Sequence, residues 1–233
     1  MEAVFFDLGN TLVKERVSGE AARKRMLDEL YRCLREEGEC VNYEALKNAL
    51  EKGFKECAER VKGSFKELNP EDVFKRCFES LGLTFDEELL RKALKAYFYS
   101  RVDTVELYDD ALPTLKALKS KGLKLALISN ALPDGRAVYE ALGLSKYFDI
   151  AIFSFEVGLK KPHPLLFEQA LNALGVKERE SLMVGDSLEA DILGARILGM
   201  EAALIVRNGI KVTLSVTPSY IISDLRQLLN LLT

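Results

Sequence analysis

AVFFDLGNTL, residues 3 to 12, places a run of apolar side chains directly before a carboxylate and a loop. A run of this length that ends at Asp7 and the turn-forming pair Gly9-Asn10 is typical of a buried strand opening into a loop. Similar runs lie at residues 123–129, 149–153, 181–185 and 202–206, and helical patterns lie between them at 109–121, 134–142, 164–174 and 188–198. Continuous apolar strands need cover on both faces, so this alternation predicts an α/β fold with a doubly wound parallel sheet.

The segment from residue 14 to residue 100 lacks strand-like runs and reads as amphipathic helices. Glycine, proline and asparagine separate these helices, as they commonly do at helix ends. We therefore expect an all-helical domain at 14–100, inserted into an α/β core formed by 1–13 and 101–233. The tail adds one more short strand, near 219–223, and a final helix at 224–232.

Composition excludes several classes of partner. With 33 basic and 36 acidic side chains the chain has a net charge of -3 and a pI near 5.5, so no basic field exists to attract nucleic acid or anionic lipid. No stretch is long and apolar enough to span a membrane, and the N-terminus lacks a signal-peptide pattern, so we expect a cytoplasmic protein. The four cysteines show no CxxC spacing and are expected to be reduced thiols. Nothing indicates an oligomeric state.

Polar side chains follow the apolar runs at the points where the expected strands end. They are Asp7, the pair Ser129-Asn130, Lys161, Asp186 and Asp191. The carboxyl ends of parallel strands meet at one edge of a sheet, where ligands of open α/β folds bind. A nucleophile, a hydroxyl group, a cation and paired acids at that edge suit attack on a phosphoryl group.

Four segments, in this order and spacing, resemble the haloacid dehalogenase superfamily of hydrolases, in its phosphatase-like branch with a helical cap inserted after the first strand. They are FFDLGNTL (5–12), LISN (127–130), GLKKPHPLLF (158–167) and VGDSLEADILGARILGM (184–200). The resemblance implies that Asp7 is the nucleophile and forms an aspartyl-phosphate. It also implies a Mg²⁺ ion held by Asp7, the Gly9 carbonyl and Asp186, with Asp191 acting through water, in keeping with the preference of Mg²⁺ for oxygen ligands.

The same resemblance assigns the remaining site residues. Ser129, Asn130 and Lys161 would hold the phosphate oxygens, where charge collects during transfer, and Thr11 would brace the loop after the nucleophile. Lys161 is preferred to Lys160 because it directly precedes proline, as in the family. The implied substrate is a small phosphorylated metabolite, over which the helical cap would close.

The chain departs from the family at Gly9. Phosphatases of the family usually carry there a second aspartate, which protonates the leaving alcohol, and such groups typically supply about 10²–10⁴-fold in rate. Three interpretations stay open: a phosphatase that obtains its acid elsewhere, a dehalogenase-like enzyme that expels halide without a proton, and a relative that only binds phosphate. The family's haloacid dehalogenases use no metal and carry a non-acidic residue at the position of Asp186, so the two retained acids favour the phosphatase.

Other residues have both a functional and a plain structural interpretation. His163 follows Lys161-Pro162 and could replace the missing acid, because an unperturbed histidine titrates near pH 6.5, but a cap for the following helix is the commoner role. The aromatic residues 97–99 are expected to pack rather than to bind substrate. Arg207 follows an expected strand on the ligand side of the sheet, where a solvated loop arginine is the commoner case.

Overall fold

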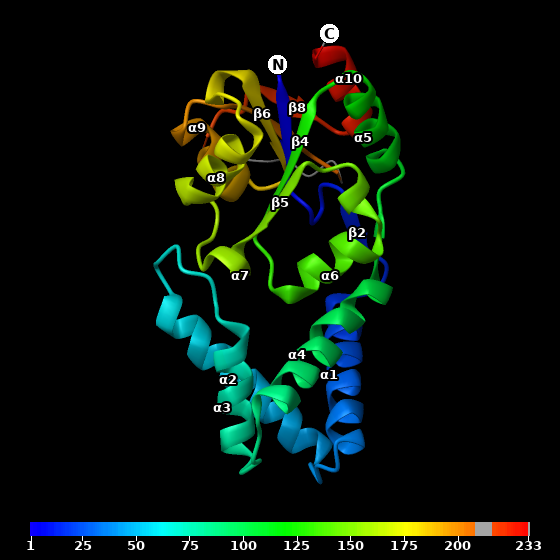
Figure 1. Cartoon of the computed structure of the whole chain (residues 1–233), viewed down its shortest axis with the longest axis vertical. Helices are drawn as coiled ribbons and strands as arrows, with labels where there is room; N and C mark the ends of the chain where they lie inside the picture. The colour runs from blue at the N-terminus through cyan, green and yellow to red at the C-terminus, as the bar shows by residue number, and fades with distance from the viewer. Residues whose placement is uncertain (208–215, 233) are drawn as a thin grey trace.

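The structure, a computed structural model, describes residues 1–207 and 216–232. Its main sheet has six parallel strands in the order β5-β4-β1-β6-β7-β8 (Figure 1). The strands are β1 (Ala3–Phe6), β4 (Lys124–Ser129), β5 (Ile150–Phe153), β6 (Ser181–Gly185), β7 (Glu201–Ile205) and β8 (Tyr220–Ile222). In the centre, Phe6 of β1 is in register with Leu127 of β4 and with Val184 of β6. The expected parallel α/β sheet is confirmed.

Helices cover both faces of this sheet, as the apolar strands required. Alternate residues of β1 enter different cores: Phe6 packs with residues of α5 (Ala111–Ser120) and α6 (Pro133–Ala141). Phe5 packs with residues of α8 (Pro164–Leu174) and α9 (Gly194–Ile197). Side chains of a strand alternate between the two faces, so a fully apolar strand is buried from both sides.

Residues 19 to 99 form four helices with a core of their own, drawn below the sheet in Figure 1. They are α1 (Gly19–Glu36), α2 (Tyr43–Val61), α3 (Pro70–Ser80) and α4 (Glu87–Tyr99). Each begins at a Ser, Asn or Asp whose side chain accepts a hydrogen bond from the first helical turn, as these residue types favour. The four cysteines are free, as expected.

A short antiparallel ribbon joins this helical segment to the sheet and was not expected. Its strands are β2 (Val13–Glu15) and β3 (Val105–Leu107). Each has only three residues, and they pair across the whole helical segment. Arg101, in the turn η1 (Ser100–Thr104), forms ion pairs with Glu15 of β2 and Asp134 of α6. The ribbon and these ion pairs fix both connections of the helical segment.

Two expected helices are shorter than the sequence suggested. The pattern at 188–198 forms a π-helical turn, η4 (Leu188–Leu193), before α9. The tail forms a 3₁₀ turn, η5 (Leu225–Gln227), before α10 (Leu228–Leu231). A four-residue helix, α7 (Ser154–Val157), directly follows β5 and was not expected. Within the described part of the chain, none of the helices could cross a membrane.

Candidate active site

The polar residues singled out in the sequence gather at the carboxyl ends of the central strands. Asp7 directly follows β1, Ser129 ends β4, and Asp186 directly follows β6. Lys161 lies in the loop between α7 and α8, and Asp191 lies in η4. Parallel pairing of β4, β1 and β6 therefore brings together residues from distant parts of the sequence.

Lys161 is buried at the centre of this group. Its side chain is 1% exposed, and its Nζ donates hydrogen bonds to Asp7 Oδ1 (2.7 Å), Asp191 Oδ1 (2.7 Å) and the Ile128 carbonyl (2.6 Å). Burial alone would lower the pKa of Lys161, but the charges of Asp191 and Asp7 outweigh it and raise the pKa. The site therefore holds a fixed positive charge beside the carboxylate of Asp7.

Three carboxylates meet beside this cation. Asp7, Asp186 and Asp191 each offer an oxygen, and these atoms lie within 4.8 Å of one another. Burial, and then the charge of Asp7, raise the pKa of Asp186, against a hydrogen bond from Asn10. Burial also raises the pKa of Asp191, which Lys161 opposes. Crowded carboxylates that resist ionisation fit a divalent cation, because Mg²⁺ takes carboxylate oxygens as ligands and would offset their repulsion.

The position of Asp191 depends on a glycine and on an irregular turn. A Cβ atom at Gly185 would lie 2.2 Å from Asp191 Oδ2, so only glycine leaves room for this carboxylate. The same oxygen accepts a hydrogen bond from the Ser187 N–H (3.0 Å). Both carboxylate oxygens of Asp191 are thus held, one by the backbone and one by Lys161. π-helical turns such as η4 are frequent at functional sites.

Asn130 braces the loop that carries Lys161. Its side-chain Oδ1 accepts a hydrogen bond from the Lys161 N–H (2.7 Å), and its Nδ2 donates one to the Lys161 carbonyl (3.0 Å). Any contact of Asn130 with a substrate would therefore come from its remaining N–H groups. The neighbouring Ser129 is buried at the end of β4, next to the Ile128 carbonyl that holds Lys161.

The loop after Asp7 combines an open position and a buried one. Gly9 is exposed, and a Cβ atom added there would meet nothing within 4 Å. Asn10 has a φ of 52°, a left-handed conformation that asparagine tolerates. Thr11 is fully buried, and its hydroxyl has no hydrogen-bond partner among the described residues.

The expectation of a solvated loop arginine at 207 is wrong. Arg207 is 9% exposed in its side chain, forms an ion pair with Asp110 and donates a hydrogen bond to the Thr11 carbonyl. Its guanidinium also lies 3.9 Å from the ring centre of Tyr108. Arg207 therefore holds the loop after β1 through the Thr11 carbonyl. No local sequence pattern indicated this role.

Several plain structural interpretations are confirmed. Nδ1 of His163 accepts a hydrogen bond from the Leu165 N–H (3.2 Å) at the start of α8, which is the capping role. Tyr97 and Phe98 are buried in the helical core, as expected. The same expectation is wrong for Tyr99, which is 42% exposed near the end of α4, with Nζ of Lys95 5.9 Å from its ring centre. Lys160 pairs through its backbone N–H with the Phe65 carbonyl, and Lys161, not Lys160, reaches Asp7.

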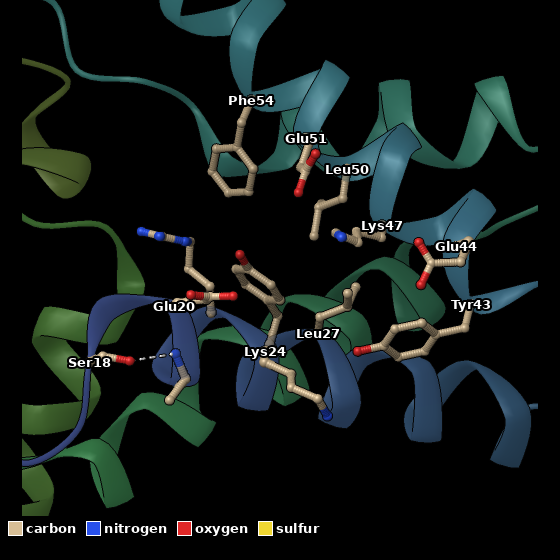
Figure 2. Close-up of a pocket in the computed structure, with 13 residues that line it drawn as sticks. Ser18, Glu20, Lys24, Leu27, Tyr43, Glu44, Lys47, Leu50, Glu51 and Phe54 are labelled. Carbon is tan, nitrogen blue, oxygen red and sulfur yellow. Dashed lines mark hydrogen bonds between the residues drawn. The ribbon is translucent and has the colours of Figure 1, made fainter.

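A large pocket lies elsewhere, within the helical segment. It has a volume of about 820 Å³ and is lined by residues of α1, α2 and α4, together with Ser18 (Figure 2). In Figure 2, Lys24 and Lys47 are drawn with Glu20, Glu44 and Glu51 around it. Its charges are mixed, and it contains none of the residues gathered around Lys161. The polar residues predicted from the sequence therefore lie at the strand ends and not in this pocket.

Relatives of this chain include proteins named as phosphatases. The chain is 35% identical over 158 residues to a phosphoserine phosphatase of Thermus thermophilus, over 67% of this chain and 62% of the relative, which is less than two thirds of that protein. It is 29% identical to a glyceraldehyde 3-phosphate phosphatase of Pyrococcus furiosus, over 100% of this chain and 93% of the relative.

Solved structures include both a phosphatase and a dehalogenase. A HAD phosphatase from Thermococcus onnurineus matches with a TM-score of 0.65 and 28% identity, over 100% of this chain and 98% of the other. A 2-haloacid dehalogenase from Pseudomonas syringae matches with a TM-score of 0.76 and 26% identity, with the same coverage. The family model of haloacid dehalogenase-like hydrolases matches residues 1–199. The chain is therefore a hydrolase that belongs to the haloacid dehalogenase-like family.

Proposed function

We propose that this hydrolase is a Mg²⁺-dependent phosphatase of small phosphorylated metabolites that acts through a phosphoryl group carried on Asp7. The observation that supports it most is the cluster of Asp7, Asp186 and Asp191 around a buried lysine. The cluster consists of the positively charged Lys161 and carboxylate oxygens, and it includes no group assigned as a general acid. Such a site suits transfer of a phosphoryl group, where catalysis is mostly positioning and charge stabilisation.

Each residue of the cluster has a part in this mechanism. Asp7 would attack phosphorus with one carboxylate oxygen while Lys161 holds the other. Asp7, Asp186 and the Gly9 carbonyl would hold Mg²⁺, and Asp191 would orient Lys161 and reach the ion through water. When bound, the ion neutralises phosphate charge and lets an anionic nucleophile approach.

The remaining predicted residues would bind the phosphate. The hydroxyl of Ser129 and a free N–H of Asn130 would contact its oxygens as negative charge builds up. The three N–H groups of Lys161 are already bonded to Asp7, Asp191 and the Ile128 carbonyl, so Lys161 would act on the phosphate oxygens through its positive charge. Thr11 would brace the loop after Asp7, and Arg207 holds the carbonyl of Thr11. Because Gly9 offers no proton, water or a group of the substrate would protonate the leaving alcohol.

We also propose that residues 14–100 act as a cap over the site and that the substrate is a small metabolite. The helical core and the paired ribbon at its base support a segment that moves as one piece. Relatives named as phosphatases of phosphoserine and glyceraldehyde 3-phosphate support a substrate of a few carbon atoms. Such metabolites occur in the cytoplasm, where we expect the enzyme to act.

A second candidate is hydrolysis of 2-haloacids. The similarity to the Pseudomonas syringae dehalogenase favours it, and so does Gly9, because loss of halide needs no acid. The charge of the site argues against it, since Asp186 and Asp191 beside Asp7 would repel a carboxylate substrate unless a cation were bound. The phosphatase therefore ranks first.

One panel of assays tests both. We expect the purified chain to hydrolyse p-nitrophenyl phosphate with Mg²⁺ and to stop when EDTA is added. Asp7→Asn should abolish turnover, whereas Lys160→Met should leave it unchanged. Halide release from 2-haloacids that continues in EDTA would identify the dehalogenase. Stabilisation by Mg²⁺ without turnover of any phosphate would identify a binding protein and refute the proposed function.

A further inference from the structure

The connection between α2 and α3 reaches the sheet and pairs with the segment just before Lys161. Lys66 and Leu159 form an antiparallel bridge. The Phe65 carbonyl accepts a hydrogen bond from the Lys160 N–H (2.7 Å), and the Glu67 N–H donates one to the Gly158 carbonyl (2.9 Å). Figure 1 shows this connection beside α7. We call residues 65–67 the docking loop.

The side chain of Glu67 continues from this ladder into the sheet domain. Its Oε2 accepts a hydrogen bond from the hydroxyl of Ser154 (2.5 Å), a fully buried residue that directly follows β5 and begins α7. The Ser154 oxygen in turn accepts one from the Ala131 N–H (2.9 Å). The Ser154 hydroxyl has only one proton to donate. Its short hydrogen bond to the Glu67 carboxylate is stronger than a bond to a neutral acceptor such as the Ala131 carbonyl. Glu67 therefore reaches Ala131 through a single buried hydroxyl.

Both segments held by the docking loop carry candidate site residues. Ala131 directly follows Ser129 and Asn130, and Lys160 directly precedes Lys161. Asn130 joins the two segments, because its side chain bonds to the N–H and the carbonyl of Lys161. Loss of the Glu67 side chain would release the Ser154 hydroxyl that holds Ala131, and it would remove the side-chain anchor of the docking loop, whose backbone holds Lys160. Displacement of a catalytic group by about 1 Å can cost about 10²-fold in rate.

We infer that Glu67 is a positioning residue. When the helical segment contacts the sheet domain, Glu67 would fix the positions of Asn130 and Lys161 through Ser154 and the docking loop. Glu67 itself touches none of the reacting groups. The inference rests on the proposed function for its effect on turnover, and on the hydrogen bonds alone for its effect on the two segments. Docking of the helical segment would then complete the site as well as cover it.

The test compares Glu67→Ala with Glu67→Gln and with a matched surface control, Glu59→Ala. The side chain of Glu59, in the last turn of α2, is 59% exposed and forms an ion pair with Lys62, the residue that caps the same helix. With p-nitrophenyl phosphate and Mg²⁺, we expect Glu67→Ala to lower kcat by about 10- to 100-fold with a smaller change in KM. Glu67→Gln keeps an acceptor for the Ser154 hydroxyl and should restore most of kcat. The control should match the wild type.

Amide hydrogen exchange is a second measurement of the coupling, and it does not depend on enzymatic turnover. Glu67→Ala should raise the exchange rates of Ala131 and Lys160 but not that of Phe5 in the central strand. A kcat equal to that of the control would overturn the inference even if the melting temperature fell, and so would unchanged exchange. If Glu67→Ala does not fold, Ser154→Ala interrupts the same connection. If the wild type hydrolyses no phosphate, the proposed function fails, and exchange alone decides whether the coupling exists.

Discussion

Nζ of Lys161 lies 2.7 Å from Oδ1 of Asp7, although the two residues are 154 positions apart in the chain. A second bond of the same length joins Lys161 to Asp191, which is 1% exposed. The lysine thus compensates two carboxylates in a region that water hardly reaches. Buried ions are costly unless they are paired, so this arrangement should matter for folding as well as for chemistry.

Lys161→Met should therefore lose both activity and stability. It leaves Asp191 without its cation, and removal of one partner from a buried pair typically costs about 3–5 kcal/mol in the free energy of unfolding. Lys160→Met is the matched control, because the contact that Lys160 makes with Phe65 uses its backbone. Urea unfolding and turnover of both variants check this. Equal stability of the two variants would contradict the account of Lys161.

Gly185→Ala should disturb the site without touching a charged residue. The added Cβ would lie 2.2 Å from Asp191 Oδ2, and the carboxylate cannot simply move away because Ser187 and Lys161 hold it. We expect a fall in kcat and in melting temperature. Gly19→Ala, at the start of α1, is the control, since a Cβ at Gly19 meets only the end of the Arg23 side chain, at an ordinary contact distance of 3.6 Å. Normal turnover of Gly185→Ala would show that Asp191 can shift freely.

The sequence was informative where one short segment determines the outcome. A run such as residues 3–6 must be buried from both sides, so the six strands of the parallel sheet and the position of Asp7 could be predicted. The edge at which Asp7, Ser129 and Asp186 would meet followed from parallel pairing. These inferences need only the order of the segments along the chain.

Features that depend on pairing between distant segments could not be predicted. The strands β2 and β3 have three residues each and exist because they pair with one another across the helical segment. Arg207 was expected to be solvated because its partners, Asp110 and Thr11, are far away in sequence. In the sequence Glu67 resembles many other surface acids, because its contact with Ser154 depends on how the docking loop packs against the sheet domain. The π-helical turn at Asp191 could not be predicted for a different reason, because its apolar pattern is that of an ordinary helix.

Asp134, at the base of the helical segment, should make stability depend on pH. Burial raises the pKa of its carboxyl from 3.8 to about 6, against the effect of Arg101. As the pH rises from about 4 to 6, the unfolded chain loses this proton before the folded protein does, so the free energy of unfolding falls across that window. Asp134→Asn removes this contribution, and Arg101 keeps its ion pair with Glu15.

Urea unfolding at several pH values between 4 and 7 checks this effect. We expect the stability of Asp134→Asn relative to the wild type to increase as the pH rises from 4 to 6 and to be constant above. Asp103→Asn is a control, because Asp103 pairs with Arg25 on the surface and its side chain is 64% exposed. Parallel pH curves for the wild type and Asp134→Asn would contradict the raised pKa.

Gly9→Asp should supply the proton donor that the site lacks. The position is exposed, and a Cβ atom there would meet nothing within 4 Å, so the backbone leaves room for a side chain to begin. An alkyl alcohol is a poor leaving group and needs protonation, whereas p-nitrophenolate hardly does. We therefore expect turnover of alkyl phosphates to rise by up to about 10²–10⁴-fold and that of p-nitrophenyl phosphate to change little. Gly9→Asn, which has the same size without the acid, should show no such gain. If both variants gained equally, or if the wild type already hydrolysed the two kinds of substrate at equal rates, another group would be donating the proton.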